Sequence, residues 1–402
     1  MPTTRRILLA APGLLLATPA AAQQRPPARP PAPRPPARPA GTPAATPLGP
    51  LDTQARHLFF QDFETEAVLA EKGADERIPP ASMSKLMTMY VVFDLLKQGR
   101  LSLSQTMTVS QAARNVEGSR MFLEAGSQVS VQDLARGVIV QSGNDACIAL
   151  AEGIAGSERA FAEMMNETAR RIGLTGSTFR NATGLPDPDH RMTCRDLARL
   201  ARRLIQDFPE YYRLYSERSF TWNNITQANR NPLLGRFPGA DGLKTGSTQE
   251  AGFGLTASAQ QGGRRLILVL AGLPSMAARA EEALRLMEWG FASFENIVLF
   301  RAADALEQVP VHLGTRPSVP LVGGRDVVLT LPRAWRESLE VRLRYAAPVT
   351  APVMRGQELG ALEISGRHIP PARFPLYAGA DVERLGFLSR IPAVLAHLLG
   401  RG

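Results

Sequence analysis

Three short segments, Ser82-Met83-Ser84-Lys85, Ser142-Gly143-Asn144 and Lys244-Thr245-Gly246, decide how this 402-residue chain is interpreted. Each segment alone is uninformative, because a serine near a lysine or a Ser-Gly-Asn turn is common in folded proteins. In this order and spacing, they are typical of a nucleophilic serine that is activated by a lysine instead of a histidine. The trio therefore predicts acyl-transfer chemistry at one cleft.

The spacing of Ser82 and Lys85 suits a nucleophile and its base. A serine hydroxyl is a weak nucleophile at neutral pH and needs an adjacent group to take its proton. The run 83–96 contains no Gly or Pro, which predicts a helix with Ser82 at its start and Lys85 on the same face. Lys85 can act as a base only if burial or a nearby cation lowers its pKa. Lys244 is the natural candidate for that cation.

The other two segments supply polar groups to the same cleft. A single glycine separates Ser142 from Asn144, so both side chains can leave a tight turn toward a common point. We assign Ser142 to proton relay and Asn144 to binding a substrate amide. The run 251–259 follows Lys244-Thr245-Gly246, and its small and β-branched residues predict a strand along the cleft. Gly246 would let a substrate backbone approach closely.

From about Ala55 to the C-terminus, the chain resembles the low-molecular-mass penicillin-binding proteins of the D-alanyl-D-alanine carboxypeptidase family. The matching segments are Ile78-Pro79-Pro80-Ala81-Ser82-Met83-Ser84-Lys85-Leu86-Met87-Thr88, Ser119-Arg120-Met121-Phe122-Leu123, Ser142-Gly143-Asn144-Asp145-Ala146-Cys147, Gln227-Ala228-Asn229-Arg230-Asn231 and Asp241-Gly242-Leu243-Lys244-Thr245-Gly246. Two features depart from the family pattern. Ser84 replaces the usual threonine, and Glu64-Thr65-Glu66 replaces a glycine-containing hairpin turn.

The resemblance implies a serine-type carboxypeptidase that acts on peptidoglycan in cell-wall biogenesis. Ser82 would attack the penultimate D-alanine of a pentapeptide stem, release the terminal D-alanine and pass the acyl group to water. Backbone N–H groups of Ser82 and Ser247 would form the oxyanion hole. β-Lactam antibiotics, whose strained amide resembles D-Ala-D-Ala, would acylate the same serine.

The resemblance also implies which residues bind the substrate. We expect Arg279 to hold the terminal carboxylate of the peptide and Arg230 to border the cleft, although either arginine could instead form a surface ion pair. The expected substrate-binding set is Asn144, Arg230, Thr245, Gly246, Ser247 and Arg279.

Two other functions remain open at this point. A class A β-lactamase shares the trio but needs a glutamate to activate the deacylating water. Its loop has no clear match between Asn144 and Lys244, where the segment 179–185 instead follows the carboxypeptidase pattern. A non-catalytic cell-wall scaffold could keep the fold without turnover, but the intact Ser82 and Lys85 argue against it.

The composition of the chain divides it into five parts. Residues 1–22, with Arg5-Arg6, an apolar stretch and Ala20-Ala21-Ala22, are typical of a secretory signal peptide, and residues 23–50 of a disordered Pro/Ala/Arg-rich linker. Residues 51–294 would form the catalytic domain and 295–380 a small β-rich domain with a spacer or docking role. In residues 381–402, the leucines recur at near-helical spacing, which together with the resemblance predicts an amphipathic membrane-surface helix.

The fold class that follows is α+β, with an antiparallel sheet covered by helices and then a small all-β domain. We expect strands at 55–60 and 265–271, and helices at 131–155, 158–172 and 195–208. In the β domain, strands are expected at 327–331, 341–345 and 360–364. A helix packed on the β domain is the alternative for the tail.

Charge and cysteine content exclude several classes of function. Six arginines among the first fifty residues supply most of the formal net charge of +9, so the basic balance does not indicate nucleic-acid binding. The five histidines show no metal-ligand spacing, so we expect neither a metal nor a cofactor. Cys147 and Cys194 could pair in an exported protein, but buried free thiols are favoured. The expected location is the periplasm, at the outer face of the cytoplasmic membrane.

Overall fold

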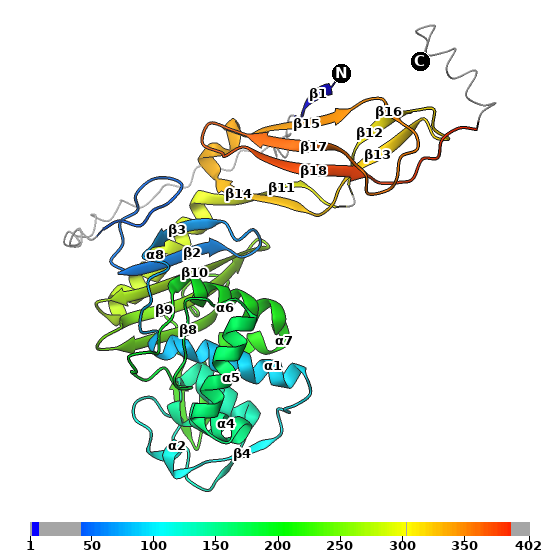
Figure 1. Ribbon diagram of the computed structural model, residues 1–402. Coiled ribbons are helices and arrows are strands. Elements are labelled where there is room, and N and C mark those ends of the chain that lie inside the picture. The colour runs from blue at the N-terminus through cyan, green and yellow to red at the C-terminus, as the bar shows by residue number, and fades with distance from the viewer. Residues whose placement is uncertain (1, 8–41, 303, 387–402) are drawn as a thin grey trace, which may run out of the picture. The chain divides into compact units, whose positions relative to one another are not determined.

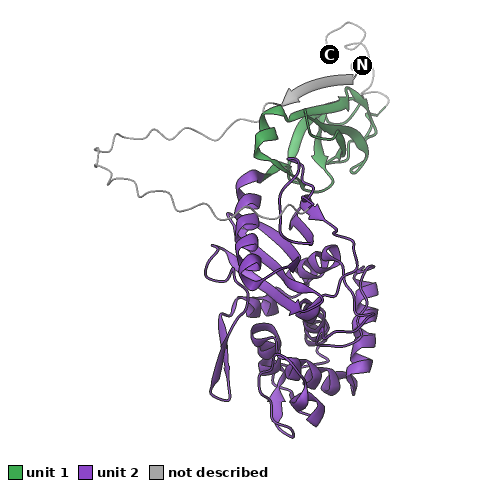
Figure 2. Cartoon of the chain, turned by 90° about the vertical axis from the view of Figure 1, so that its left-hand side faces the viewer, with its two compact units in different colours: residues 1–37, 295–402 green, residues 38–294 purple. Residues whose placement is uncertain are grey.

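The structure is a computed structural model that describes residues 2–7, 42–302 and 304–386. The chain divides into two compact units, residues 38–294 and residues 1–37 with 295–402, coloured separately in Figure 2. Most of the expected signal peptide and linker, and the tail from residue 387, lie outside the described residues.

The unit of residues 38–294 is built on a five-stranded antiparallel sheet with the strand order β3-β2-β10-β9-β8 (Figure 1). The sheet strands are β2 (His57–Asp62), β3 (Val68–Lys72), β8 (Ala240–Thr248), β9 (Gly252–Gln261) and β10 (Arg264–Leu273). The helices are α1 (Lys85–Lys97), α2 (Gln111–Asn115), α3 (Val131–Arg136), α4 (Asn144–Ala155), α5 (Glu158–Arg171), α6 (Cys194–Asp207), α7 (Pro209–Tyr212) and α8 (Met276–Ser293). Two small hairpins complete the unit: β4 (Thr106–Thr108) with β5 (Gln128–Ser130), and β6 (Ser219–Trp222) with β7 (Ile225–Ala228).

Helices cover both faces of this sheet, and the central strand β10 contributes to two apolar cores. Ile267 and Val269 join the core that holds α1, α4, α5 and α6, whereas Leu266 and Leu268 join the core beneath α8. This alternation is the period of two of a strand, and burial on both faces explains why residues 266–271 of β10 are all apolar. An antiparallel sheet covered by helices was expected from the sequence, and the structure confirms it.

Two expected boundaries in this unit need correction. Ala44 and Ala45 pair with Leu51 and Glu71, and Ala44 is buried in the core beneath α8, so residues 42–50 belong to this unit and not to the linker. The expected helix over 131–155 is also interrupted. After α3 the chain forms a π-helical turn over 137–141, and α4 begins only at Asn144.

The second unit contains a seven-stranded sheet with the order β1-β15-β17-β18-β13-β12-β16, and the pair β11-β14. The strands are β1 (Pro2–Ile7), β11 (Phe294–Phe300), β12 (Ala305–His312), β13 (Ser318–Gly323), β14 (Val327–Pro332), β15 (Glu340–Ala346), β16 (Val349–Thr350), β17 (Glu358–Ser365) and β18 (Ala372–Ala378). The expected all-β character is confirmed. Strand β1, which pairs with β15, lies in the segment that we expect a signal peptidase to remove. Cleavage of that segment after Ala22 remains a prediction.

The amphipathic helix expected over residues 381–402 does not begin at Asp381. Val382 is buried and pairs with Val353, Arg384 pairs with Gly314, and the Leu385 N–H donates to the Leu313 carbonyl at 2.8 Å. Residues 381–386 are therefore part of the β unit and not the first turns of an amphipathic helix. Within the described residues, no helix has the length and apolar character needed to cross a membrane.

Candidate active site

Ser82 lies in a 3₁₀ turn, η1 (Ala81–Ser84), directly before α1. Helix α1 is buried on nearly all sides, as its apolar sequence predicts, so it forms a rigid support. Ser84 is the N-cap of α1 but makes no side-chain capping bond, and η1 has none either. The hydroxyl of Ser82 is therefore not used as a helix cap.

Lys85 is the first residue of α1, and its ammonium is held by three polar groups. Nζ lies 2.9 Å from Oγ of Ser82, 2.7 Å from Oδ1 of Asn144 and 2.5 Å from the carbonyl oxygen of Thr183. The residue is only 1% exposed. The structure therefore brings the expected nucleophile and base together and adds a backbone acceptor.

Burial sets the protonation of this lysine. Removal from water, together with the positive charge of Arg230, lowers the pKa of Lys85 to about 8, although Cys147 and Asp145 oppose the shift. Burial and the charge of Lys85 also lower the pKa of Lys244, well below its usual value. The positive charge that contributes to the lowered pKa of Lys85 is that of Arg230, where we expected that of Lys244.

The carbonyl of Thr183 belongs to a loop, residues 181–185, that packs directly on the nucleophile turn. Gly184 has a φ of +76°, and a Cβ on it would collide with the carbonyl oxygen of Ala81. Thr88 donates from α1 to the Ala182 carbonyl at 2.7 Å. Because these contacts fix the loop to both η1 and α1, the acceptor for Lys85 is preorganised.

Ser142 and Asn144 reach the site from the break before α4. Ser142 is 1% exposed with a φ of +62°, a left-handed conformation that is strained for a non-glycine residue. Its Oγ has no hydrogen-bond partner among the described residues, so it is free to exchange a proton with a ligand. Asn144 accepts from Lys85 and donates from Nδ2 to the Glu117 carbonyl at 2.6 Å, which fixes the orientation of its amide.

Lys244, Thr245 and Gly246 lie within the edge strand β8 itself, so β8, and not the expected run 251–259, borders the cleft. A Cβ on Gly246 would lie 3.1 Å from the backbone nitrogen of Ser82. The glycine thus admits the backbone of the nucleophile turn, where we expected the backbone of a substrate. Ser247 is exposed directly after this contact.

The two expected arginines occupy different settings. Arg230 donates to Oγ of Ser119 at 2.5 Å. Arg279, on α8, is 6% exposed, yet its Nε has no partner and Nη1 makes only a 3.5 Å bond to the Gly254 carbonyl. Burial lowers the pKa of Arg279, and the charge of Arg230 adds to this shift. A buried guanidinium without an acidic partner among the described residues is suited to an anionic ligand.

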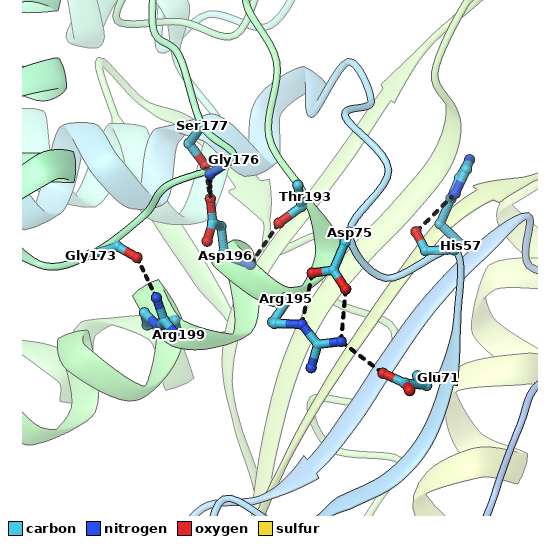
Figure 3. A network of polar contacts seen from close by, with 11 residues as sticks. His57, Glu71, Asp75, Gly173, Gly176, Ser177, Thr193, Arg195, Asp196 and Arg199 are labelled. Atoms are coloured by element: carbon cyan, nitrogen blue, oxygen red, sulfur yellow. Dashed lines mark hydrogen bonds and ion pairs between the residues drawn. The ribbon is translucent and has the colours of Figure 1, made fainter.

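Figure 3 shows a polar network that anchors two segments leading into the site. Arg195 makes a bidentate contact with Asp75, at 2.7 and 2.9 Å, on the chain that runs into η1. Asp196 accepts from Oγ of Ser177 at 2.7 Å, on the turn that runs into the 181–185 loop. Both residues lie in the first turn of α6, so one helix end positions both segments.

Sequence reasoning missed three groups at this site. The Thr183 carbonyl has no sequence signature, because every residue carries one. His190, considered only as a metal ligand, lies 2.7 Å through Nε2 from Oγ of Ser84 and is 2% exposed. Asp145 is fully buried and accepts the backbone N–H groups of Met121 and Leu123. Its only sequence signal was an acidic residue inside an otherwise apolar run.

Both cysteines are buried and unpaired, as favoured from the sequence. Cys147 lies one turn after Asn144 in α4, and burial raises its thiol pKa to about 12, so the thiol stays protonated beside the site. Cys147 is therefore poorly suited to act as a nucleophile.

Comparison with known proteins agrees with this geometry. Residues 42–275 match the family model described as D-alanyl-D-alanine carboxypeptidase, and residues 294–384 match that of the penicillin-binding protein 5 C-terminal domain. D-alanyl-D-alanine carboxypeptidase DacC of Escherichia coli is 40% identical over 84% of this chain and 86% of that protein.

Solved structures give the same result. Penicillin-binding protein 5 of Haemophilus influenzae, 38% identical, covers 83% of this chain and 99% of its own, with a TM-score of 0.74. The ampicillin-bound form of penicillin-binding protein D2 from Listeria monocytogenes, 31% identical, covers 60% of this chain and 98% of its own, with a TM-score of 0.53.

Proposed function

Because this chain belongs to the D-alanyl-D-alanine carboxypeptidase family, we propose that its site removes the terminal D-alanine from peptidoglycan pentapeptide stems through an acyl-enzyme on Ser82. One observation carries the assignment of residues. The ammonium of Lys85 lies 2.9 Å from Oγ of Ser82 and its pKa is lowered to about 8, so roughly a tenth of it is neutral at pH 7, far more than for an ordinary lysine.

In the acylation step, neutral Lys85 accepts the proton of Ser82 as Oγ attacks the penultimate D-alanine carbonyl. The backbone N–H groups of Ser82 and Ser247 stabilise the oxyanion. Ser142, whose hydroxyl is unpartnered, relays a proton to the leaving nitrogen of the terminal D-alanine. Water then attacks the ester, and its hydrolysis frees Ser82 and the shortened peptide.

Substrate binding uses the remaining expected residues. The amide of Asn144 binds a backbone amide of the stem peptide, and Thr245 and Gly246 on β8 border its other side. The buried, unpaired guanidinium of Arg279 binds the terminal carboxylate, an interaction that is stronger than a neutral hydrogen bond. Arg230 contributes positive charge at the rim of the cleft.

The same mechanism makes β-lactams slow substrates, because they acylate Ser82 but the ester is poorly hydrolysed. Rapid hydrolysis would need a glutamate that activates water. Glu158 acts electrostatically on Lys85, but its Oε1 already accepts the Ala182 N–H at 3.0 Å. The site therefore supports a carboxypeptidase over a β-lactamase, and the hydrogen bond between Ser82 and Lys85 supports an enzyme over a scaffold.

The test is to incubate the purified protein with a pentapeptide muropeptide and, separately, with benzylpenicillin, and to follow both by mass spectrometry. We expect loss of one alanine from the peptide and a long-lived penicilloyl adduct on the protein. Rapid turnover of the penicillin with an intact pentapeptide would indicate a β-lactamase. An unchanged peptide and an unmodified protein would indicate a scaffold.

Export by an N-terminal signal peptide and attachment to the outer face of the cytoplasmic membrane by residues 387–402 complete the proposal. Residues 8–22 and 387–402 lie outside the described residues, and the support for both segments is their sequence pattern. We assign the β-rich unit a spacer or docking role because none of the three catalytic segments falls in it.

A further inference from the structure

In the β-rich unit, strand β18 is paired along only part of one edge. The strand lies between β17 and β13 in the seven-stranded sheet (Figure 1). It pairs with β17 over residues 372–377, but with β13 only over residues 376–378. After Gly323 the chain turns away toward β14, and no other strand among the described residues takes its place. One edge of residues 372–375 is therefore open.

A cavity of about 290 Å³ lies beside this open edge. Phe300 and Val327, which are both buried, contribute apolar surface to it, and the half-buried rings of Phe374 and Tyr377 line it as well. Successive residues of a strand point to opposite faces of its sheet. Since both Phe374 and Tyr377 line the cavity, it lies at the edge of β18 and not over one face.

Two consecutive glycines leave room for the aromatic rings of this cavity. A Cβ on Gly323 would collide with the ring of Phe300, and a Cβ on Gly324 would lie 2.8 Å from Cε2 of Tyr377. Neither glycine has a positive φ, so the backbone conformation does not require glycine at these positions. The two glycines are therefore needed for space, and any side chain at residue 324 would displace a ring that lines the cavity.

Arg325 adds a positive charge to the lining of the cavity. Its side chain is exposed and forms no ion pair with any acid among the described residues. The adjacent carboxylate, Asp326, is already engaged, because it accepts from Arg301 at 2.7 Å and from the Ala302 N–H at 2.8 Å. A carboxylate that reaches the cavity can therefore pair with Arg325 without breaking an existing ion pair.

We propose that the open edge of β18 and this cavity form a docking site for an extended, acidic segment of a partner protein. The segment adds to β18 as a further strand, places one large apolar side chain in the cavity and pairs a neighbouring carboxylate with Arg325. The small volume suits a single side chain better than a whole ligand.

The charge of Arg325 argues against the chain's own linker as the occupant, because residues 23–41 contain arginines and no acid. An open strand edge is otherwise a liability that folded proteins cover or charge. The inference deepens the docking role proposed for the β-rich unit and does not depend on the catalytic assignment.

Fluorescein-labelled pentapeptides Thr-Glu-Xaa-Glu-Thr, with alanine, leucine or phenylalanine as Xaa, test the site by fluorescence anisotropy on the full-length protein. We expect saturable binding, and a dissociation constant about tenfold or more lower for leucine and phenylalanine than for alanine, because the larger side chains bury more apolar area. Replacing both glutamates by lysine should weaken binding roughly tenfold.

Two N-methylated versions of the phenylalanine peptide, methylated at positions 2 and 4 or at positions 3 and 5, test the strand addition. Each version blocks the backbone N–H groups of one edge. Only one of them should lose binding, because a single edge of the added strand pairs with β18.

Two variants separate the charge from the cavity. Arg325→Gln should remove the preference for glutamate over lysine and keep that for phenylalanine over alanine, whereas Arg367→Gln, at another exposed arginine of the unit, should change neither. Gly324→Val should bring the affinities for phenylalanine and alanine close together. Gly386→Val, where a Cβ has open space around it, is the matched control. Melting temperatures show whether each variant is folded, and Arg325→Gln, a change at an exposed side chain, tests the site independently of Gly324→Val.

The docking site is overturned if none of the three peptides binds saturably up to about 1 mM, or if alanine and phenylalanine bind equally. Equal binding of both N-methylated peptides would overturn the strand addition. Binding of an N-acetylglucosamine trisaccharide, with none of the peptides, would overturn the peptide occupant in favour of a glycan.

Covalent labelling by benzylpenicillin separates these outcomes from failure of the proposed function. No residue of the cavity takes part in the acylation of Ser82, so we expect equal labelling of the wild-type protein and all four variants. A protein that binds the peptides but takes up no penicillin would contradict the proposed function and leave the docking site supported.

Discussion

At the residue scale, the chemistry depends on how Lys85 is kept partly neutral. Its ammonium is buried among acceptors, and this desolvation, together with the charge of Arg230, lowers its pKa to about 8. The acylation rate should therefore rise with pH until the lysine is fully deprotonated.

This dependence on Arg230 can be measured. Arg230→Gln removes the positive charge that disfavours the protonated ammonium of Lys85. The pKa of Lys85 should therefore rise, and a smaller fraction of the lysine should be neutral at pH 7. We expect penicillin acylation at pH 7 to fall roughly two- to fivefold and the midpoint of its pH profile to move to higher pH. Arg236→Gln, the same charge change at an exposed position, is the control. An unmoved midpoint in Arg230→Gln would contradict the electrostatic account.

Arg279 gives a second prediction at this scale. Its buried guanidinium can pair with a substrate carboxylate but gains little from a neutral amide. Arg279→Gln should lower kcat/KM on a peptide ending in D-Ala-D-Ala by roughly 10- to 100-fold, and should affect the C-terminally amidated peptide far less. If both substrates lose equally, Arg279 supports the fold and does not bind the carboxylate.

At the element scale, the first turn of α6 positions the segments on either side of the site. Asp196 accepts from the Gly176 N–H and from Ser177, and its own N–H is capped by Thr193 (Figure 3). Asp196→Ala leaves these donors unpaired in a partly buried place. We expect the free energy of unfolding to fall by about 2 kcal/mol in urea titrations. Glu163→Ala, which removes an exposed ion pair with Arg159, should cost under about 0.5 kcal/mol. Equal losses would show that the network is not stabilising.

The elements that the sequence predicted well are those with a strong periodic signal. Strand β10 and helices α5 and α6 agree with expectation to within one or two residues, because burial imposes a clear pattern on them. The break before Ser142 was not expected inside an apolar run, since a π-turn leaves no compositional signal. The edge strand β8 was also missed, because Lys244, Gly246 and Ser247 are not typical strand residues.

The candidate site followed the same rule. Motif residues that carry side-chain chemistry could be predicted: Lys85 bonds to both Ser82 and Asn144, and Lys244 lies on β8, the strand that packs against Ser82 at Gly246. The Thr183 carbonyl could not be predicted, because a backbone acceptor depends on the fold of its loop. The left-handed backbone of Phe122, with a φ of +65°, could not be predicted either. Asp145, far along the sequence, accepts the N–H groups of the residues on either side of it, Met121 and Leu123.

At the scale of the whole molecule, the structure indicates where residues 387–402, the proposed membrane anchor, can be removed without damage to the folded part. Val382 and Arg384 pair within the β unit, so a truncation after Gly386 spares that unit, whereas one at Asp381 would damage it. We expect the protein without residues 387–402 to move from the membrane pellet to the soluble periplasmic fraction. Its cleavage of small peptides should be unchanged, because the catalytic segments all lie before residue 295. A truncated protein that still sediments with membranes would place the attachment elsewhere.

The central claim is that Ser82, activated by Lys85, is the nucleophile for both the peptide and the antibiotic. The most direct test is to label the wild-type protein and Ser82→Ala with benzylpenicillin, digest both and map the adduct by mass spectrometry. The account predicts one penicilloyl group on the wild-type peptide that contains Ser82, and neither an adduct nor D-alanine release with Ser82→Ala. An adduct on any other residue, or D-alanine release that persists in the variant, would contradict it.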